Sequence, residues 1–144
     1  MIKVICVGKL KEKYLSDAVL DYVNRIKKYH KIEIIEVPDG DIDTEKNYII
    51  RKIGLKDYVI TLDIKGSTLT SEELAKKIDK TFITNPNITF IIGGSLGLHE
   101  DINKISNYSL SFSKLTFPHG LFRIILLEQI YRSFKILNNE TYHK

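Results

Sequence analysis

The sequence predicts an α/β domain, built as a mainly parallel sheet with helices on both faces. Short β-branched runs alternate with longer amphipathic runs, which is the order of a β-α-β chain. Two short runs, "VIT" and "FII", consist of β-branched and apolar residues, as in strands covered on both faces. A length of 144 residues with 43% hydrophobic side chains fits one ordered domain, residues 1–144.

Five runs are predicted as strands from their β-branched and aromatic residues. They are Ile2–Gly8, Lys31–Val37, Asp57–Ile64, Asn87–Gly94 and Tyr108–Phe112. Between the second and third runs, Pro38–Asn47 carries acidic residues and a glycine and is predicted as a polar, flexible loop.

Three segments are predicted as helices. Tyr14–Tyr29 has apolar residues at the spacing of one helical face. Thr70 and Glu73 form the S/T-x-x-E capping-box pattern that begins a second helix. Gly120–Leu137 is apolar nearly all round, so we expect it to be buried on more than one side, by the sheet and by a partner chain.

In parallel sheets ligands bind at the carboxyl ends of the strands, which directs attention to the loops "DIKGST", "GGSLG" and "SKLTFPHG". Gly93–Gly97 matches G-x-S-x-G, so one hypothesis is a serine hydrolase with Ser95 as nucleophile. The other is a tight glycine turn that lets the backbone approach a ligand. A hydrolase needs an ordered acid and histidine in a longer chain, so the turn is favoured.

The loop after the fifth strand combines hydroxyl groups with apolar side chains. This composition suits a flat ligand such as an adenosine, held by backbone hydrogen bonds, and it equally suits a simple turn with its aromatic residues in the core. His119 follows at the start of the last predicted helix. Three roles are open for it: a helix cap, a residue at the edge of the core, or a catalytic group. No P-loop or G-x-G-x-x-G motif is present, which argues against a kinase-like ATPase and an ordinary Rossmann enzyme.

Net charge and cysteine content bear on the partners of the protein and on its cellular compartment. The net charge of +4 is compatible with an anionic partner and with an ordinary solvated surface. The single cysteine, Cys6, lies in an apolar run, which excludes an internal disulfide and predicts a core position in a reducing compartment. No apolar stretch has the length of a membrane helix, so we expect a cytoplasmic protein without membrane contact.

Charged and aromatic residues near the carboxyl end have two interpretations each. Glu128 and Arg132 are four residues apart on the last predicted helix. They are interpreted either as an ordinary ion pair or as part of a functional site. Tyr142, His143 and Lys144 form either a solvated end or a tail that stacks on a base and neutralises phosphate.

Five motifs, "VGKLKEKY", "IIGGSLGLH", "SFSKLTFPH", "LLEQIYRSFKI" and "YHK", follow one another along the whole chain. Together they resemble the ribosomal RNA large-subunit methyltransferase H family of the SPOUT, or α/β-knot, superfamily. The resemblance implies a carboxyl-terminal trefoil knot and a homodimer with its active site near the interface. It also implies transfer of a methyl group from S-adenosylmethionine to N3 of a pseudouridine in 23S rRNA of the assembled 70S ribosome, without a metal.

The resemblance also implies site residues. The S-adenosylmethionine contacts fall on Leu62, Gly93, Phe112, Ser113, Lys114, Leu115, Thr116 and Phe117. The substrate side falls on Glu128, Arg132, Tyr142, His143 and Lys144. One departure is a shorter segment between "IIEVPDG" and "DYVITLDI", which bears on ribosome contacts rather than catalysis. A knotted RNA- or nucleotide-binding protein without turnover stays open as an alternative.

Overall fold

The structure, a computed structural model that describes residues 1–144, is built on a single five-stranded sheet. The strands are β1 (Ile2–Val7), β2 (Ile32–Val37), β3 (Asp57–Thr68), β4 (Asn87–Ile92) and β5 (Tyr108–Ser111). Their order across the sheet is β2-β1-β4-β3-β5, and every neighbouring pair is parallel. The predicted parallel sheet is confirmed, and its strands all end at the same edge.

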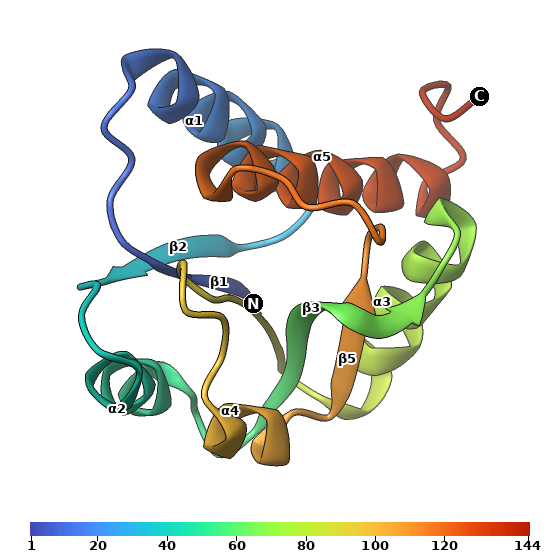
Figure 1. The fold of residues 1–144 in the computed structure, drawn as a ribbon. Helices are drawn as coiled ribbons and strands as arrows, with labels where there is room; N and C mark the ends of the chain where they lie inside the picture. The colour runs from blue at the N-terminus through green and yellow to red at the C-terminus, as the bar shows by residue number, and fades with distance from the viewer.

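Five helices cover the two faces of the sheet. They are α1 (Lys13–Lys27), α2 (Ile42–Lys52), α3 (Ser71–Thr84), α4 (Glu100–Ile105) and α5 (His119–Leu137). Figure 1 shows α1 and α5 on one face and α2 and α4 on the other, and α5 packs against both α1 and α3. Apolar clusters fill both sides of the sheet, the larger one beneath α1, α3 and α5. The predicted cover on both faces is therefore confirmed.

The capping box predicted at the start of α3 is present in the hydrogen bonds of the structure. At the start of α3, the Thr70 hydroxyl accepts a bond from the Glu73 amide (3.1 Å), and the Glu73 carboxylate accepts one from the Thr70 amide (2.8 Å). This is the predicted capping box, and it satisfies two amides that the helix itself leaves free.

The prediction of a flexible polar loop over Pro38–Asn47 is wrong, because α2 begins at Ile42. The Asp41 carboxylate caps this helix by accepting a bond from the Thr44 amide (2.8 Å). Of the helix's apolar side chains only Ile49 is buried, so the segment has too few apolar residues for a helical period to stand out.

Strand β3 is also longer than predicted, since it continues past Ile64 to Thr68. A register shift allows this: Leu110 of β5 pairs with Leu62 before the irregularity and with Ser67 after it. The segment "DIKGST" is therefore part of a distorted strand and not a loop.

Helix α5 has the predicted burial on more than one side. Leu126, Leu127 and Ile130 are fully buried between the sheet and the neighbouring helices. No helix of the structure combines the length and the apolar character needed to cross a bilayer. Cys6 is buried as predicted, and burial raises the pKa of its thiol to about 12, so the thiol stays protonated and unreactive.

An ion pair ties the amino ends of the strands together at the opposite edge of the sheet. The Asp57 carboxylate is fully buried; it pairs with Lys3 and accepts bonds from the Gly54 amide (2.8 Å) and the Thr89 hydroxyl (2.9 Å). Burial by itself raises the pKa of this carboxyl, but these bonds outweigh it and hold the pKa below its ordinary value.

Replacing Asp57 by Asn should lower the free energy of unfolding by about 3 kcal/mol at pH 7, because Lys3 is left buried without its partner. A carboxyl with a lowered folded-state pKa stabilises fully above its unfolded pKa of about 3.9 and loses that contribution as the pH falls further. The deficit should therefore shrink below pH 4 in urea unfolding experiments. The exposed Asp39→Asn variant is the control, and an equal loss in both variants would contradict this assignment.

Candidate active site

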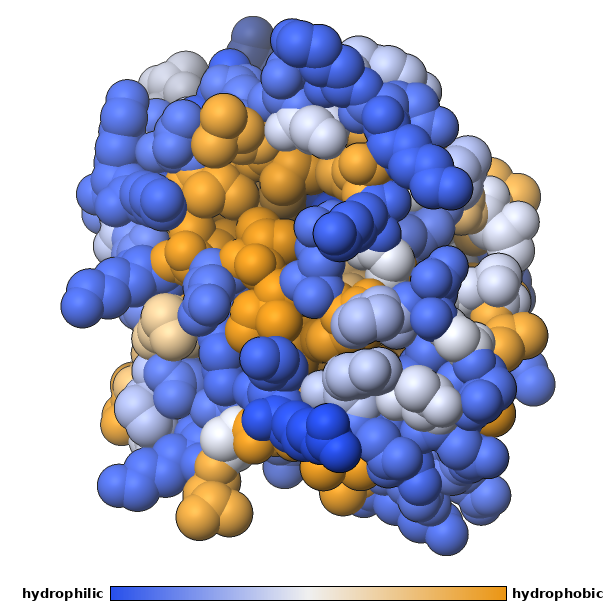
Figure 2. Space-filling model, turned by 90° about the vertical axis from the view of Figure 1, so that its left-hand side faces the viewer, coloured by the Kyte–Doolittle hydropathy of each residue, from blue (hydrophilic) through white to orange (hydrophobic).

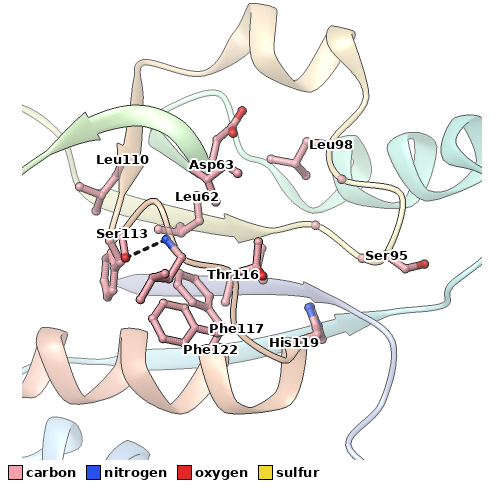
Figure 3. Close-up of a pocket in the computed structure, with 17 residues that line it drawn as sticks. Leu62, Asp63, Ser95, Leu98, Leu110, Ser113, Thr116, Phe117, His119 and Phe122 are labelled. Carbon is pink, nitrogen blue, oxygen red and sulfur yellow. Dashed lines mark hydrogen bonds between the residues drawn. The ribbon is translucent and has the colours of Figure 1, made fainter.

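A cavity of about 620 Å³ opens at the edge of the sheet where the strands end. Its lining comes from the middle of β3, from the ends of β4 and β5 with the loops that follow them, and from the start of α5 (Figure 3). Figure 2 shows an apolar area, surrounded by polar side chains, on the face toward which β1 and β2 point. The volume and the mainly apolar lining are typical of a small-molecule or cofactor site.

All but one of the predicted cofactor residues line this cavity. Those that line it are Leu62, Gly93, Phe112, Ser113, Leu115, Thr116 and Phe117, whereas Lys114 of the same loop is not part of the lining. Residues of β3 and of the segments after β4 and β5 therefore meet around one cavity, although the first and the last of them are 55 positions apart in the sequence. The cavity has further lining residues that were not predicted, among them Asp63 and His119.

The turn after β4 requires glycine at two positions. Gly97 has a φ of +75° and donates its amide to the Gly94 carbonyl (3.0 Å). A Cβ at Gly93 would lie 2.7 Å from the Gly97 carbonyl oxygen, which is closer than atoms can approach. The predicted tight glycine turn is present, and Ser95 within it has no hydrogen-bonded histidine to activate it as a nucleophile.

The loop after β5 forms the opposite wall. The Leu115 amide donates to the Ser113 hydroxyl (2.9 Å; Figure 3). The Ser111 hydroxyl donates to the Ser113 carbonyl (3.1 Å). Phe112 packs at 5.3 Å from the ring of Phe122 of α5. The aromatic residues of this loop are thus anchored on α5 and wall the cavity at the same time.

His119 begins α5 and faces the cavity, where Figure 3 shows it on the same side as Ser95 and Thr116. The Arg123 guanidinium lies 3.3 Å from its Nε2. Burial, with a further contribution from the charge of Arg123, lowers the pKa of the imidazole. The structure therefore gives His119 a place in the site that the sequence left undecided.

A second cluster gathers four of the five predicted substrate residues. Arg132 forms an ion pair with Glu128 (2.6 Å) and contacts Nδ1 of His143 (3.1 Å). Tyr142 packs edge-on against Tyr131 at 5.0 Å, with the Arg132 guanidinium over its ring at 4.8 Å. The terminal segment is therefore docked on α5, whereas Lys144 is exposed and makes no side-chain contact there.

Glu72, at the start of α3, completes this cluster and was not identified from the sequence. Its carboxylate lies 2.7 Å from Nε2 of His143. Since arginine only donates, Nδ1 of His143 accepts a hydrogen bond from Arg132. The ring proton is therefore on Nε2, which donates a hydrogen bond to the Glu72 carboxylate. The only sequence signal near Glu72 is the capping box, formed by Thr70 two residues before it and Glu73 directly after it.

The cavity and this cluster are separate within one chain. His119 and Arg132 are thirteen positions apart on α5, which corresponds to about 20 Å along the helix. None of Glu72, Glu128, Arg132, Tyr142 and His143 lines the cavity. No group of three or more metal-ligating side chains is present in either place.

Comparison with known proteins identifies the family. A family model described as "Predicted SPOUT methyltransferase" matches residues 1–143. The chain belongs to the SPOUT methyltransferase family. Its cavity at the carboxyl ends of the strands is accordingly the candidate active site of a methyltransferase.

Relatives of high identity extend over the full chain. Ribosomal RNA large subunit methyltransferase H of Clostridium botulinum strain Alaska E43 is 52% identical, with 99% of each chain covered. A Methanococcus maripaludis protein, to which the same name is given provisionally, is 54% identical over 157 positions with the same coverage. The alignment is longer than the 144 residues of this chain, as expected for relatives with an insertion.

Solved structures share the fold. A probable methylase family protein from Haemophilus influenzae matches with a TM-score of 0.58 at 12% identity, over 99% of this chain and 70% of that chain. The SpoU methyltransferase AviRb from Streptomyces viridochromogenes, in complex with AdoMet, matches with a TM-score of 0.51 at 10% identity, over 93% and 60%. Both support the SPOUT-like α/β architecture.

Replacing Gly93 by Ala should distort the glycine turn, because the new methyl group meets backbone that cannot move aside as a side chain can. We expect a loss of about 1–3 kcal/mol in the free energy of unfolding, as for other overpacked sites. The control is Gly40→Ala, where the nearest atoms to a Cβ are 3.8 Å away. Equal stability of the two variants in urea unfolding would show that the turn tolerates a side chain.

Proposed function

We propose that this protein transfers the methyl group of S-adenosylmethionine to N3 of a pseudouridine in 23S rRNA of the assembled 70S ribosome. The observation that carries the proposal is the cavity itself, in which the separate motifs of a SPOUT methyltransferase meet around one glycine turn. The rRNA substrate is supported by relatives named ribosomal RNA large subunit methyltransferase H. A ribosomal substrate would place the reaction in the cytoplasm.

The residues of the cavity fit S-adenosylmethionine, which supplies an electrophilic methyl group on a sulfonium. A side chain at Gly93 would fill the place where backbone approaches the cavity. Leu62, Leu115 and Phe117 offer apolar surface to an adenine ring, and Ser113 and Thr116 offer polar groups at the rim. Much of the rate would come from holding the nitrogen and the methyl group about 3 Å apart and in line.

The substrate side must remove the N3 proton. Glu128 and His143 are the candidate acceptors, but Arg132 occupies both carboxylate oxygens of Glu128 and Nδ1 of His143. Nδ1 of His143 has one lone pair and must leave Arg132 before it accepts a proton, whereas each Glu128 oxygen keeps a second lone pair that can accept one. The guanidinium is then available to stabilise the negative charge that develops on the pyrimidine.

A homodimer is part of the proposal, because one chain keeps the cavity and the Glu128 cluster apart. Large apolar side chains near the cavity and at the start of α1 are exposed: Tyr14 and Leu115 each at 71%, and Leu121 at 41%. Burying such residues against a second copy is favourable. We infer that the dimer brings the Glu128 cluster of one protomer to the cavity of the other, and that each chain forms the trefoil knot of its superfamily.

Recognition of the substrate would depend on an assembled ribosomal shape. The net charge of +4 offers few phosphate contacts to a protein that docks on naked RNA. The alternative class, a knotted RNA- or nucleotide-binding protein without turnover, keeps the same cavity. It differs only in the outcome of the transfer experiment.

The function is tested by transfer of a radiolabelled methyl group from S-adenosylmethionine to 70S ribosomes, free large subunits and naked 23S rRNA from a strain without this enzyme. We expect label in 23S rRNA, mapped to N3 of a pseudouridine, with 70S ribosomes as the best substrate. No label, with S-adenosylmethionine still bound in calorimetry, would support the non-catalytic alternative. No binding would overturn the cofactor assignment.

The dimer is tested by mixing two inactive variants. Gly93→Ala disables the cavity and Arg132→Ala disables the substrate cluster, so each homodimer should be inactive. After co-refolding, half of the dimers are mixed at random, and each should contain one intact composite site, giving about a quarter of wild-type activity. Mixing either variant with itself is the control. An inactive mixture would show that each site lies within one protomer.

A further inference from the structure

A group of charged side chains gathers around the buried Arg123, behind the cavity. Arg123 of α5 is 1% exposed; it forms an ion pair with Glu36 at the end of β2 (2.6 Å) and donates to the Gly8 carbonyl (3.3 Å). Its Nη2 also lies 3.3 Å from Nε2 of His119, which lines the cavity. Arg123 therefore connects the ends of β1 and β2 to a group that faces the cofactor site.

These contacts determine the protonation of His119. A guanidinium has only donors, so Nε2 of His119 must be the acceptor in this pair. The ring proton is then on Nδ1 and the ring is neutral, with the backbone of Gly93 and Val7 beside the imidazole. Protonation of Nε2 would replace this bond with two positively charged groups 3.3 Å apart in a buried place.

Several other charges face the imidazole or its partner, and they act in different directions. Glu45 of α2 is 4% exposed and favours the charged ring, and Asp63 lies across the cavity on β3. Burial and Arg123 outweigh these groups and lower the pKa of His119, while Cys6 of β1 stays an uncharged thiol. The only two buried side-chain polar atoms without a hydrogen bond in the chain, Nε of Arg123 and Oε1 of Glu45, belong to this group.

We propose that Arg123 is a positioning residue that holds His119 in its neutral, Nδ1-protonated form, so that the imidazole adds no positive charge to the lining of the cavity in which a sulfonium would bind. The proposal rests on S-adenosylmethionine being the cofactor and goes beyond it, because it assigns a role in distinguishing substrate from product. S-adenosylmethionine carries a sulfonium charge, whereas the product S-adenosylhomocysteine has a neutral thioether. A charged imidazole would repel the first ligand and not the second.

Calorimetric titration of both ligands at pH 7.5 and pH 5.5 tests the role of Arg123. In the wild-type protein the ratio of the two affinities should change less than about twofold, because His119 stays neutral. In Arg123→Met the positive charge that opposes protonation of the imidazole is gone, so the affinity for S-adenosylmethionine relative to S-adenosylhomocysteine should fall at pH 5.5 by more than the twofold limit expected for the wild-type protein. Arg123→Lys, which keeps the charge, should restore most of the pH independence.

Arg51→Met is the matched control, because Arg51 is an exposed arginine on α2. A purely structural role of Arg123 predicts that both ligands weaken together at both pH values, which would overturn the proposal. If Arg123→Met does not fold, Glu36→Gln loosens the same guanidinium and allows the same comparison. Nitrogen NMR of the wild-type protein adds a direct reading: His119 should be neutral with the proton on Nδ1 at pH 6, and a proton on Nε2 would contradict the proposal.

The outcomes also separate this inference from the proposed function. If the wild-type protein binds neither ligand, the cofactor assignment fails. If it binds both but loses S-adenosylmethionine selectively as the pH falls to 5.5, the cofactor assignment holds and the role of Arg123 is wrong.

Discussion

The shared direction of the five strands is the constraint on which the rest of this structure depends. Because every neighbouring pair is parallel, the strands all end at one edge, and the loops that follow β4 and β5 meet there although they are distant in the sequence. The buried Asp57–Lys3 pair holds the opposite edge. The cavity is thus a consequence of sheet topology, and the side chains around it determine its chemistry.

Helix α5 links this edge to the far side of the molecule. It begins with His119 at the cavity, carries Arg123 into the core, and presents Glu128 and Arg132 where the terminal segment docks. Each charge in this otherwise apolar helix has a partner, since an unpaired charge would be costly to bury. The helix is therefore more than a packing element: its two ends carry the two halves of the proposed site, too far apart to act within one chain.

Much of this arrangement is predictable from local pattern, and the failures have identifiable causes. The glycine turn at Gly93 and the Thr70 capping box are local, so the sequence suffices to find them. Helix α2 was missed because its start depends on the Asp41 cap and Ile49 is its only buried apolar side chain. The second half of β3 was missed because a shifted pairing with Leu110 is a property of the neighbouring strand.

The sequence by itself determined the α/β class, the strands, the loops that line the cavity and, through its motifs, the family. Only the tertiary structure decided which charges meet. Glu36 is 87 positions from Arg123, and Glu72 is 71 positions from His143, and no local pattern links either pair. Hydrogen bonding and the burial of charge depend on distances in space, so the neutral form of His119 and the docked state of the tail become visible only once the chain is folded.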